Sequence, residues 1–212
     1  MPDRPSVEAV TEALEKAPAR RFSESVELSI NLKDLDLSIP KNRLEDDIPL
    51  PHGRGTGVKV AVFGSPELLQ KIRGVADRVM TGPEVEELAK DPKAAKQFAT
   101  EMDFFLAEAP LMPTIGKRLG VVLGPRGKMP RPVPPGTDPT NQINALKRSI
   151  RVRTKSNRTF HAAIGTRSMP AEQLAQNVDA VLQRVMGKLE RGRTNIESVY
   201  VKTTMGPAVR IW

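Results

Sequence analysis

The sequence predicts a mixed α/β and α+β chain of two domains, in which a discontinuous α+β domain built from both chain ends carries an inserted Rossmann-like α/β domain. The middle of the chain alternates short apolar runs with helical segments, whereas both ends contain strands of alternating apolar and polar residues. Gly53, Gly55 and Gly57 stand where the first pattern changes. Neither end looks large enough to bury a core alone, so we expect residues 1–56 and 150–212 to form domain one and residues 57–149 to form domain two.

The first end predicts a helix, a strand and a loop. Ser6 to Ala17 has apolar residues at helical spacing, with Ser6 as the expected N-cap. Apolar and polar residues alternate over residues 24–32, as in a half-buried strand. A polar loop then leads to a short strand that ends near Pro49, and the glycine-rich residues 52–57 are expected to form a hinge or linker.

The middle of the chain predicts a parallel sheet, because strands alternate with helices. The expected strands are residues 58–63, 78–80 and 104–107, and the expected helices are residues 67–76, 84–100 (interrupted at Asp91-Pro92), 115–123 and 141–148. Residues 128–140 are rich in proline and are expected to form a long loop.

The last end predicts an antiparallel hairpin, a helix and two strands. Arg151, Arg153 and Lys155 alternate with apolar residues, and Ser156-Asn157 can turn the chain into residues 159–164, so we expect a hairpin with one basic face. A long amphipathic helix is expected over residues 171–189, followed by strands at 199–201 and 208–211 around the loop 203–207.

Charge is distributed unevenly along the chain, whose net charge is +8. Residues 113–212 hold 18 Lys and Arg against 5 Asp and Glu, and the remaining residues hold 15 against 20. Such a basic half favours a polyanion partner, and nucleic acid is the natural one. A solvated basic surface without a ligand is the alternative, and a membrane-binding helix is disfavoured because the basic residues fall on expected strands and loops.

Cysteine is absent, which excludes disulfides, thiolate metal sites and a cysteine nucleophile. No apolar run approaches the roughly 18 residues that span a bilayer, and no signal sequence is evident, so we expect a cytoplasmic protein without membrane contact.

Enzymatic motifs are incomplete, so we expect no catalytic residue, no metal and no cofactor. Gly64-Ser65-Pro66 lacks the glycine spacing of a dinucleotide-binding turn, and residues 124–128 have neither the spacing nor the hydroxyl of a P-loop. His52 and His161 form no metal-ligand pattern. A solvated loop is a better interpretation of the acidic residues 45–47 than a divalent-ion site.

Two segments suggest a binding function: residues 115–130, a helix ending in a basic Gly/Pro loop, and residues 198–207, a strand ending in a tight loop. An ordinary surface loop and an ordinary turn are the alternatives. In the second segment Gly206 permits close backbone approach, and Thr203 and Thr204 supply hydroxyls that could bond RNA sugars and phosphates.

At these segments the sequence resembles the large-subunit ribosomal protein L-one family, archaeal type. Residues 119–130 resemble its signature, residues 203–207 its RNA-binding loop, and residues 50–53 the entry to its inserted domain. The resemblance implies a structural constituent of the large subunit that binds rRNA, forms the mobile stalk at the tRNA exit site and assists release of deacylated tRNA. It also implies repression of its own mRNA through a mimic of the rRNA site. We further expect a monomer outside the ribosome.

The resemblance and the loop chemistry together predict the RNA-binding residues, namely Arg21, Phe22, Glu27, Ser198, Lys202, Thr203, Thr204, Met205, Gly206 and Pro207. Arg21 stands where a lysine is common in the family, so its charge is kept but its contact geometry differs. Secondary basic contacts are expected from Arg151, Arg153, Lys155 and Arg210. The alternatives are a Rossmann-like enzyme acting on a small molecule and a nonspecific basic protein that coats nucleic acid.

Overall fold

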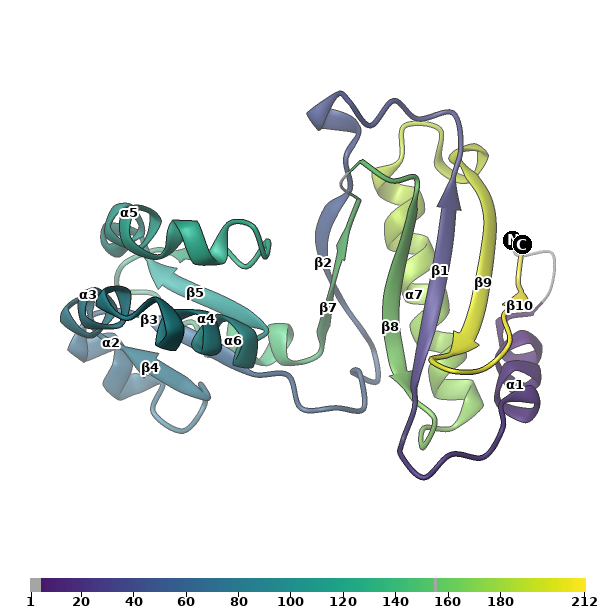
Figure 1. Cartoon of the computed structure of the whole chain (residues 1–212), viewed down its shortest axis with the longest axis horizontal. Coiled ribbons are helices and arrows are strands. Elements are labelled where there is room, and N and C mark those ends of the chain that lie inside the picture. Colours follow the sequence, from purple (N-terminus) through teal and green to yellow (C-terminus); the bar gives the residue numbers. More distant parts are fainter. Residues whose placement is uncertain (1–4, 155) are drawn as a thin grey trace. The chain divides into compact units, whose positions relative to one another are not determined.

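The computed structural model describes residues 5–154 and 156–212 and has the predicted mixed α/β character (Figure 1). The chain divides into two compact units. Unit 1 is Met1–Thr56 with Arg148–Trp212, and unit 2 is Gly57–Lys147. Among the described helices, none is both long and apolar enough to cross a membrane.

Unit 1 is built on a four-stranded antiparallel sheet with the order β10-β9-β1-β8. Val26, Leu28 and Ile30 are fully buried, which confirms the strand predicted from alternation. Helices α1 and α7 pack against this apolar face and leave the other face of the sheet uncovered by helices (Figure 1). The elements are α1 (Ser6–Lys16), β1 (Ser25–Leu32), η1 (Pro40–Asn42), β8 (Thr159–Thr166), α7 (Ala171–Lys188), η3 (Gly192–Asn195), β9 (Ile196–Thr203) and β10 (Val209–Arg210).

The predicted hairpin between residues 150–155 and 159–164 is wrong. β7 (Ser149–Arg153) pairs antiparallel with β2 (Glu45–Pro49) instead, as a separate two-stranded sheet. The register places Arg153 opposite Glu45 and Arg151 opposite Asp47. Opposite charges facing each other across a ladder favour this pairing over a hairpin with its neighbour in sequence.

The predicted N-cap of the first helix is also wrong. The helix α1 begins at Ser6, but the Ser6 hydroxyl donates to Asp179 Oδ1 at 2.6 Å and does not cap the helix, whose N-cap residue is Pro5.

The hinge expected at the glycine-rich residues stays a prediction, although two of its glycines have contacts within unit 1. The buried Asn177 amide donates to the Gly53 carbonyl at 2.9 Å, and a Cβ added at Gly55 would lie 2.6 Å from Thr166 Oγ1.

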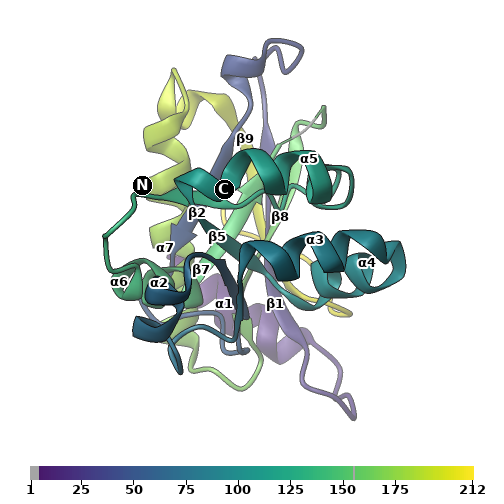
Figure 2. The ribbon, with the colours of Figure 1, turned by 90° about the vertical axis from the view of Figure 1, so that its left-hand side faces the viewer.

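Unit 2 is a four-stranded parallel sheet with the order β4-β3-β5-β6 and helices on both faces (Figure 2). Val60 and Val62 belong to the core under α2 and α6, whereas Ala61 and Phe63 belong to the core under α3, α4 and α5. The elements are β3 (Val60–Phe63), α2 (Pro66–Lys71), β4 (Arg78–Met80), α3 (Gly82–Lys90), α4 (Pro92–Glu101), β5 (Phe104–Glu108), η2 (Ala109–Leu111), α5 (Met112–Leu123), β6 (Arg131–Val133) and α6 (Thr140–Lys147).

Strand β6 lies inside the segment that was expected to be a loop. Arg131 and Pro132 are exposed and only Val133 is buried, so the strand has no readable alternation. It occupies an edge of the sheet, where a proline without an N–H is tolerated.

Candidate nucleic-acid interface

A buried carboxylate joins the two chain ends of unit 1. Glu24, which precedes β1, is 1 % exposed and accepts a hydrogen bond from the Met205 backbone N–H at 3.0 Å. Its other oxygen lies 3.1 Å from the Arg167 guanidinium. Arg167 also donates to the carbonyls of Ala17 and Pro18. The loop at residues 203–207 and the segment 17–24 are therefore held against each other by one charged network.

Thr204 adds a second connection between the β9–β10 loop and β1. Its backbone N–H donates to the Ser25 carbonyl at 3.0 Å, and its hydroxyl lies 3.2 Å from both that carbonyl and Glu27 Oε1. A hydroxyl has one proton to donate and two lone pairs with which to accept. The Thr204 oxygen therefore still has acceptor capacity towards a ligand, although the side chain is not free.

Gly206 is placed where no side chain fits. A Cβ at this position would overlap Thr203 Oγ1 and would approach Ala17 Cβ to 3.3 Å. The Gly206 N–H donates to the Thr203 carbonyl at 3.1 Å, which closes the turn. The glycine is thus required by packing inside the loop, whether or not a ligand approaches it.

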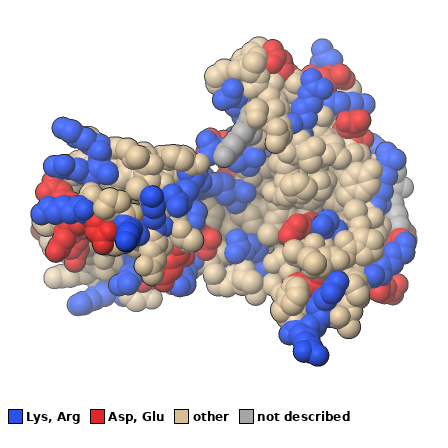
Figure 3. Space-filling view, in the orientation of Figure 1, with Lys and Arg blue, Asp and Glu red and all other residues tan. Residues whose placement is uncertain are grey.

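The uncovered face of the sheet carries polar side chains in register across three strands. Lys202 lies opposite Glu27. In another row, Asn31 Nδ2 donates to Ser198 Oγ at 2.7 Å and Thr159 Oγ1 donates to Asn31 Oδ1 at 2.8 Å. This face is largely uncharged at its centre, and its margin carries Lys and Arg side chains together with some Asp and Glu side chains (Figure 3). A surface of hydroxyl, amide and carboxylate groups bordered by cations suits the sugars, bases and phosphates of RNA.

Two large apolar side chains are exposed near the connected loops. Phe22 and Met205 are each 57 % exposed, and Arg21 beside Phe22 is exposed as well. Phe22 lies in a bend before β1. Unstacked bases pack on such apolar side chains, which makes the pair suited to single-stranded or looped RNA.

The structure gathers most of the predicted RNA-binding residues in one region of unit 1. Glu27, Ser198 and Lys202 lie on the open sheet face, Arg210 lies opposite Tyr200 in β10, and Thr204, Met205, Gly206 and Pro207 form the adjoining loop. Thr203 is an exception, because it is fully buried and supports Gly206 from beneath.

The expected secondary basic contacts are placed differently. Arg151 Nε lies 2.8 Å from Asp47 Oδ1, and Arg153 Nε lies 3.6 Å from Glu45 Oε1, so both are engaged in the β2–β7 ladder. Arg210 Nε donates to the Trp212 carbonyl. Lys155 lies outside the described residues.

Sequence reasoning missed Glu24, Arg167 and Asn31. Glu24 has the same phase as the buried Val26 and Leu28, but a carboxylate just before the alternating residues is more simply interpreted as an exposed residue outside the strand. A buried acid needs a cationic partner, and Arg167 lies 143 positions away in the chain. Asn31 is the only amide in β1, and a single amide gives little indication of the hydrogen bonds that its side chain makes to the neighbouring strands.

In unit 2, a carboxylate of the chain itself occupies the position at which nucleotide folds bind phosphate. Nucleotide folds bind phosphate beyond the carboxyl ends of the strands, at the N-terminus of the following helix. Here the Glu108 carboxylate, at the end of β5, accepts from the Ser65 backbone N–H at 2.8 Å and from the Ser65 hydroxyl at 3.1 Å. Among the described residues no group of three or more His, Asp or Glu could hold a metal ion.

Comparison with known proteins identifies the family. The model of the ribosomal protein L1p/L10e family matches residues 13–207. A protein of Thermoplasma acidophilum, "Large ribosomal subunit protein uL1", is 55% identical over 203 residues, which cover 96% of this chain and 94% of the relative. The proteins of the same name in Methanocella arvoryzae and Pyrococcus horikoshii are 52% and 50% identical, covering 100% of both chains in the first case and 97% and 94% in the second. The chain belongs to the ribosomal protein L1p/L10e family.

Proposed function

We propose that this chain is a structural, non-enzymatic constituent of the large ribosomal subunit, located on cytoplasmic ribosomes, and that it binds large-subunit rRNA through unit 1. The family membership and the name that its relatives carry, "Large ribosomal subunit protein uL1", support the assignment to the subunit. The connection of the β9–β10 loop to β1 through Glu24 and Thr204 supports the location of the RNA site.

In the proposed site, one set of residues attracts RNA electrostatically and another set discriminates the cognate RNA from other RNA. Lys202, Arg21 and Arg210 attract phosphates at long range and carry no sequence information. Glu27 has the opposite role, because an ionised carboxylate repels phosphates and accepts hydrogen bonds only from donors such as 2′-hydroxyls and base amino groups. The fixed loop then discriminates by shape, because Glu24 and Thr204 hold it against β1 and the close packing at Gly206 leaves it little freedom to move.

We extend the proposal to the finer functions implied by the family resemblance. The protein is a monomer outside the ribosome, forms the mobile stalk at the tRNA exit site and assists release of deacylated tRNA. It also represses its own translation, because a preformed surface that reads RNA shape binds any RNA that mimics the rRNA site. Competition between an rRNA fragment and the protein's own mRNA for one site tests the last function.

The experiment that tests the site is a salt titration of RNA binding. Crosslinking of the full chain to cellular RNA, followed by sequencing, first defines the cognate fragment. Glu27→Gln removes a repelling charge and an acceptor, so we expect cognate affinity to fall several-fold while affinity for random RNA stays level or rises. Thr204→Val should reduce cognate affinity roughly ten- to a hundredfold, corresponding to about 1–3 kcal/mol for a lost buried hydrogen bond.

Thr194→Val is the matched control, because Thr194 is exposed on η3, at the end of β9 opposite the loop 203–207, and the change is chemically the same. Its cognate affinity should equal that of the unmodified chain. Equal losses on cognate and random RNA in Glu27→Gln and Thr204→Val would instead identify a nonspecific coating protein. A small-molecule enzyme in unit 2 is disfavoured because Glu108 occupies the position where a phosphate would bind.

A further inference from the structure

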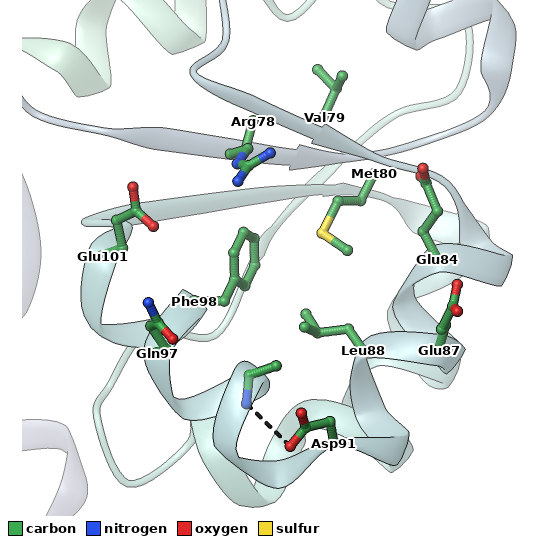
Figure 4. A pocket seen from close by; sticks show the side chains of 11 residues that line it. Arg78, Val79, Met80, Glu84, Glu87, Leu88, Asp91, Gln97, Phe98 and Glu101 are labelled. Carbon is green, nitrogen blue, oxygen red and sulfur yellow. Dashed lines mark hydrogen bonds between the residues drawn. The ribbon is translucent and has the colours of Figure 1, made fainter.

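Unit 2 contains a hollow of about 560 Å³ between β4, α3 and α4 (Figure 4). Met80, Leu88 and Phe98 point into it and form an apolar floor, whereas Val79 points away. The Phe98 ring is held in place by edge contacts with Phe63 and Phe105, at centroid distances of 6.2 and 5.6 Å. The floor is therefore a fixed surface of half-buried side chains and not a loose gap between helices.

The rim of this hollow is acidic on a chain whose net charge is +8. Four carboxylates line it against a single cation, Arg78; they belong to Glu84, Glu87, Asp91 and Glu101. Three of them have structural partners, namely Thr81, the N-terminus of α4, and Lys59. Glu87 is exposed and makes no hydrogen bond or ion pair with a residue in the described ranges 5–154 and 156–212. This rim repels RNA phosphates and attracts cationic groups.

We propose that the hollow is a docking site for a basic segment of another protein, which inserts an apolar side chain between β4 and the α3–α4 pair and places Lys or Arg side chains against the rim. The apolar floor and the acidic border match these two parts of the ligand separately. β4 is also the edge strand of its sheet, so an extended segment can bond to its unpaired backbone. The site is independent of the RNA surface proposed for unit 1.

Other cationic occupants fit less of the hollow. A metal ion needs several converging ligands, and no such group of three exists among the residues that the structure describes. A polyamine satisfies the carboxylates but leaves the floor of Met80, Leu88 and Phe98 in contact with water. A segment with both features covers the floor and neutralises the rim at once.

The experiment uses the full chain, labelled with ¹⁵N, and an acetylated, amidated peptide of sequence Lys-Lys-Leu-Lys-Lys. When the peptide is added, we expect the changes in the protein's amide chemical shifts to concentrate on residues 78–101. The affinity of the protein for the peptide should be measurable from this NMR titration. Replacing the peptide's leucine by serine should weaken binding roughly three- to tenfold, and replacing its lysines by glutamates should abolish it. Spermidine should compete only weakly.

Two protein variants locate the site. Glu87→Lys should weaken the lysine peptide roughly three- to tenfold, because it converts an attraction into a repulsion. Glu86→Lys is the matched control, since it makes the same charge change on the adjacent exposed position of α3 that does not line the hollow. Arg78→Ala should strengthen binding. Equal behaviour of the Glu86 and Glu87 variants, equal binding of the serine peptide, tight binding of spermidine or shift changes outside residues 78–101 would each overturn the proposal.

Discussion

Glu24 carries a charge in a position that is almost completely enclosed. Its side chain is buried, and its two oxygens are divided between Arg167 and the Met205 N–H. Such a carboxylate is retained only when its partners compensate the loss of hydration. Because Met205 belongs to the loop, and Arg167 also donates to the carbonyls of Ala17 and Pro18, Glu24 fixes the loop against the segment that precedes β1.

Glu24→Gln should therefore lower both stability and selective RNA binding. The neutral amide loses the ion pair with Arg167, which is 30% exposed, so we expect a loss of about 1–3 kcal/mol in the free energy of unfolding. Cognate RNA affinity should fall while affinity for random RNA changes little. Glu197→Gln, an exposed position on β9 with the same charge change, is the control. Urea unfolding and binding titrations measure both effects, and an unchanged cognate affinity would remove Glu24 from the interface.

Gly206→Ala tests whether the packing inside the loop determines the affinity for cognate RNA. The added methyl group would overlap the Thr203 hydroxyl and crowd Ala17, so the loop has to shift. We expect cognate affinity to fall roughly tenfold with an unchanged salt slope, because no charge is altered. Gly187→Ala on α7 is the matched control, since an added Cβ there meets no atom within 4 Å. A salt titration of binding to cognate and to random RNA measures the affinity and the slope. A steeper or flatter slope in Gly206→Ala would contradict the prediction.

At the scale of single residues, the sequence indicated the chemistry of the loop but not which of its side chains are buried. Thr204 and Gly206 were predicted to bind RNA because a hydroxyl and a glycine in a tight loop allow close contact with sugars and phosphates, and both assignments stay predictions. Thr203 has the same side chain as Thr204 but alternates to the core face of β9, where it is fully buried. One position along a strand reverses the direction of a side chain, and the exact end of β9 was not readable from the sequence.

Among the secondary-structure elements, the β2–β7 pair shows how local reasoning fails. The turn-forming Ser156-Asn157 favoured a hairpin between neighbours in sequence, whereas the true partner of β7 lies 104 positions away at the Asp47–Arg151 contact. Periodicity identifies a strand and its buried face but not its partner. The parallel strands of unit 2 were easier, because the alternation of strand and helix restricts the possible order.

Arg151→Ala should act on stability and not on RNA selectivity. Arg151 bonds to Asp47 through Nε at 2.8 Å and Nη2 at 3.3 Å, and the Asp47 side chain is only 3% exposed. Removing the cation leaves that carboxylate without its main compensating charge, so we expect a loss of about 1–3 kcal/mol. Adding Asp47→Asn to the Arg151→Ala variant should restore part of the lost stability. If Arg151→Ala instead weakens RNA binding at unchanged stability, Arg151 contacts phosphate.

The start of helix α3 gives unit 2 an acid-sensitive contact. Hydrogen bonds from the Thr81 backbone N–H and then from its hydroxyl lower the pKa of Glu84 below its ordinary value of 4.5. A carboxyl whose pKa is lowered by folding stabilises the folded state above its unfolded pKa, and this contribution is lost as the pH falls through the folded pKa.

Glu84→Gln should consequently lower the stability of unit 2 at pH of about 7, where the carboxylate is ionised. The difference from the unmodified chain should shrink as the pH falls below the ordinary pKa of 4.5 and through the lowered pKa of Glu84, where the carboxylate becomes protonated. Urea unfolding over a series of decreasing pH values measures the difference. Glu86→Gln on the exposed side of the same helix should show neither effect, and a pH-independent deficit in Glu84→Gln would contradict the explanation.

On the scale of the whole molecule, the charge asymmetry along the sequence has a different meaning from the one first inferred. Unit 1 contains 20 Lys and Arg against 15 Asp and Glu, and unit 2 contains 13 against 10, so the units carry +5 and +3. Acids of the first chain end pair with cations of the last, as in Glu24–Arg167, Asp46–Arg184 and Asp47–Arg151. Much of the basic second half therefore compensates the acidic first half, and only the remaining cations are available to RNA.

The same pairing predicts that unit 1 folds and binds RNA without unit 2. Each unit has its own apolar core, and the Leu50 N–H donates to the Arg148 carbonyl at 2.9 Å. Residue 148 therefore lies beside the chain six residues before Thr56, close enough for a short linker to join the two ends. Residues 1–56 joined by a short Gly-Ser linker to residues 148–212 should unfold cooperatively and keep most of the cognate affinity. Residues 57–147 should fold alone and bind RNA weakly.

Circular dichroism during thermal unfolding and binding titrations on cognate and random RNA test both fragments against the full chain. Two matched versions of the joined fragment extend the test: Thr204→Val should lose cognate affinity by the same factor as in the full chain, and Thr194→Val should lose none. Equal factors mean that the loop and the strand β1 form the selective surface by themselves, because the loop contacts of Glu24 and Thr204 are all made within unit 1. A larger loss of affinity in the fragment than in the full chain, or equal RNA binding by residues 57–147, would assign part of the selectivity to unit 2.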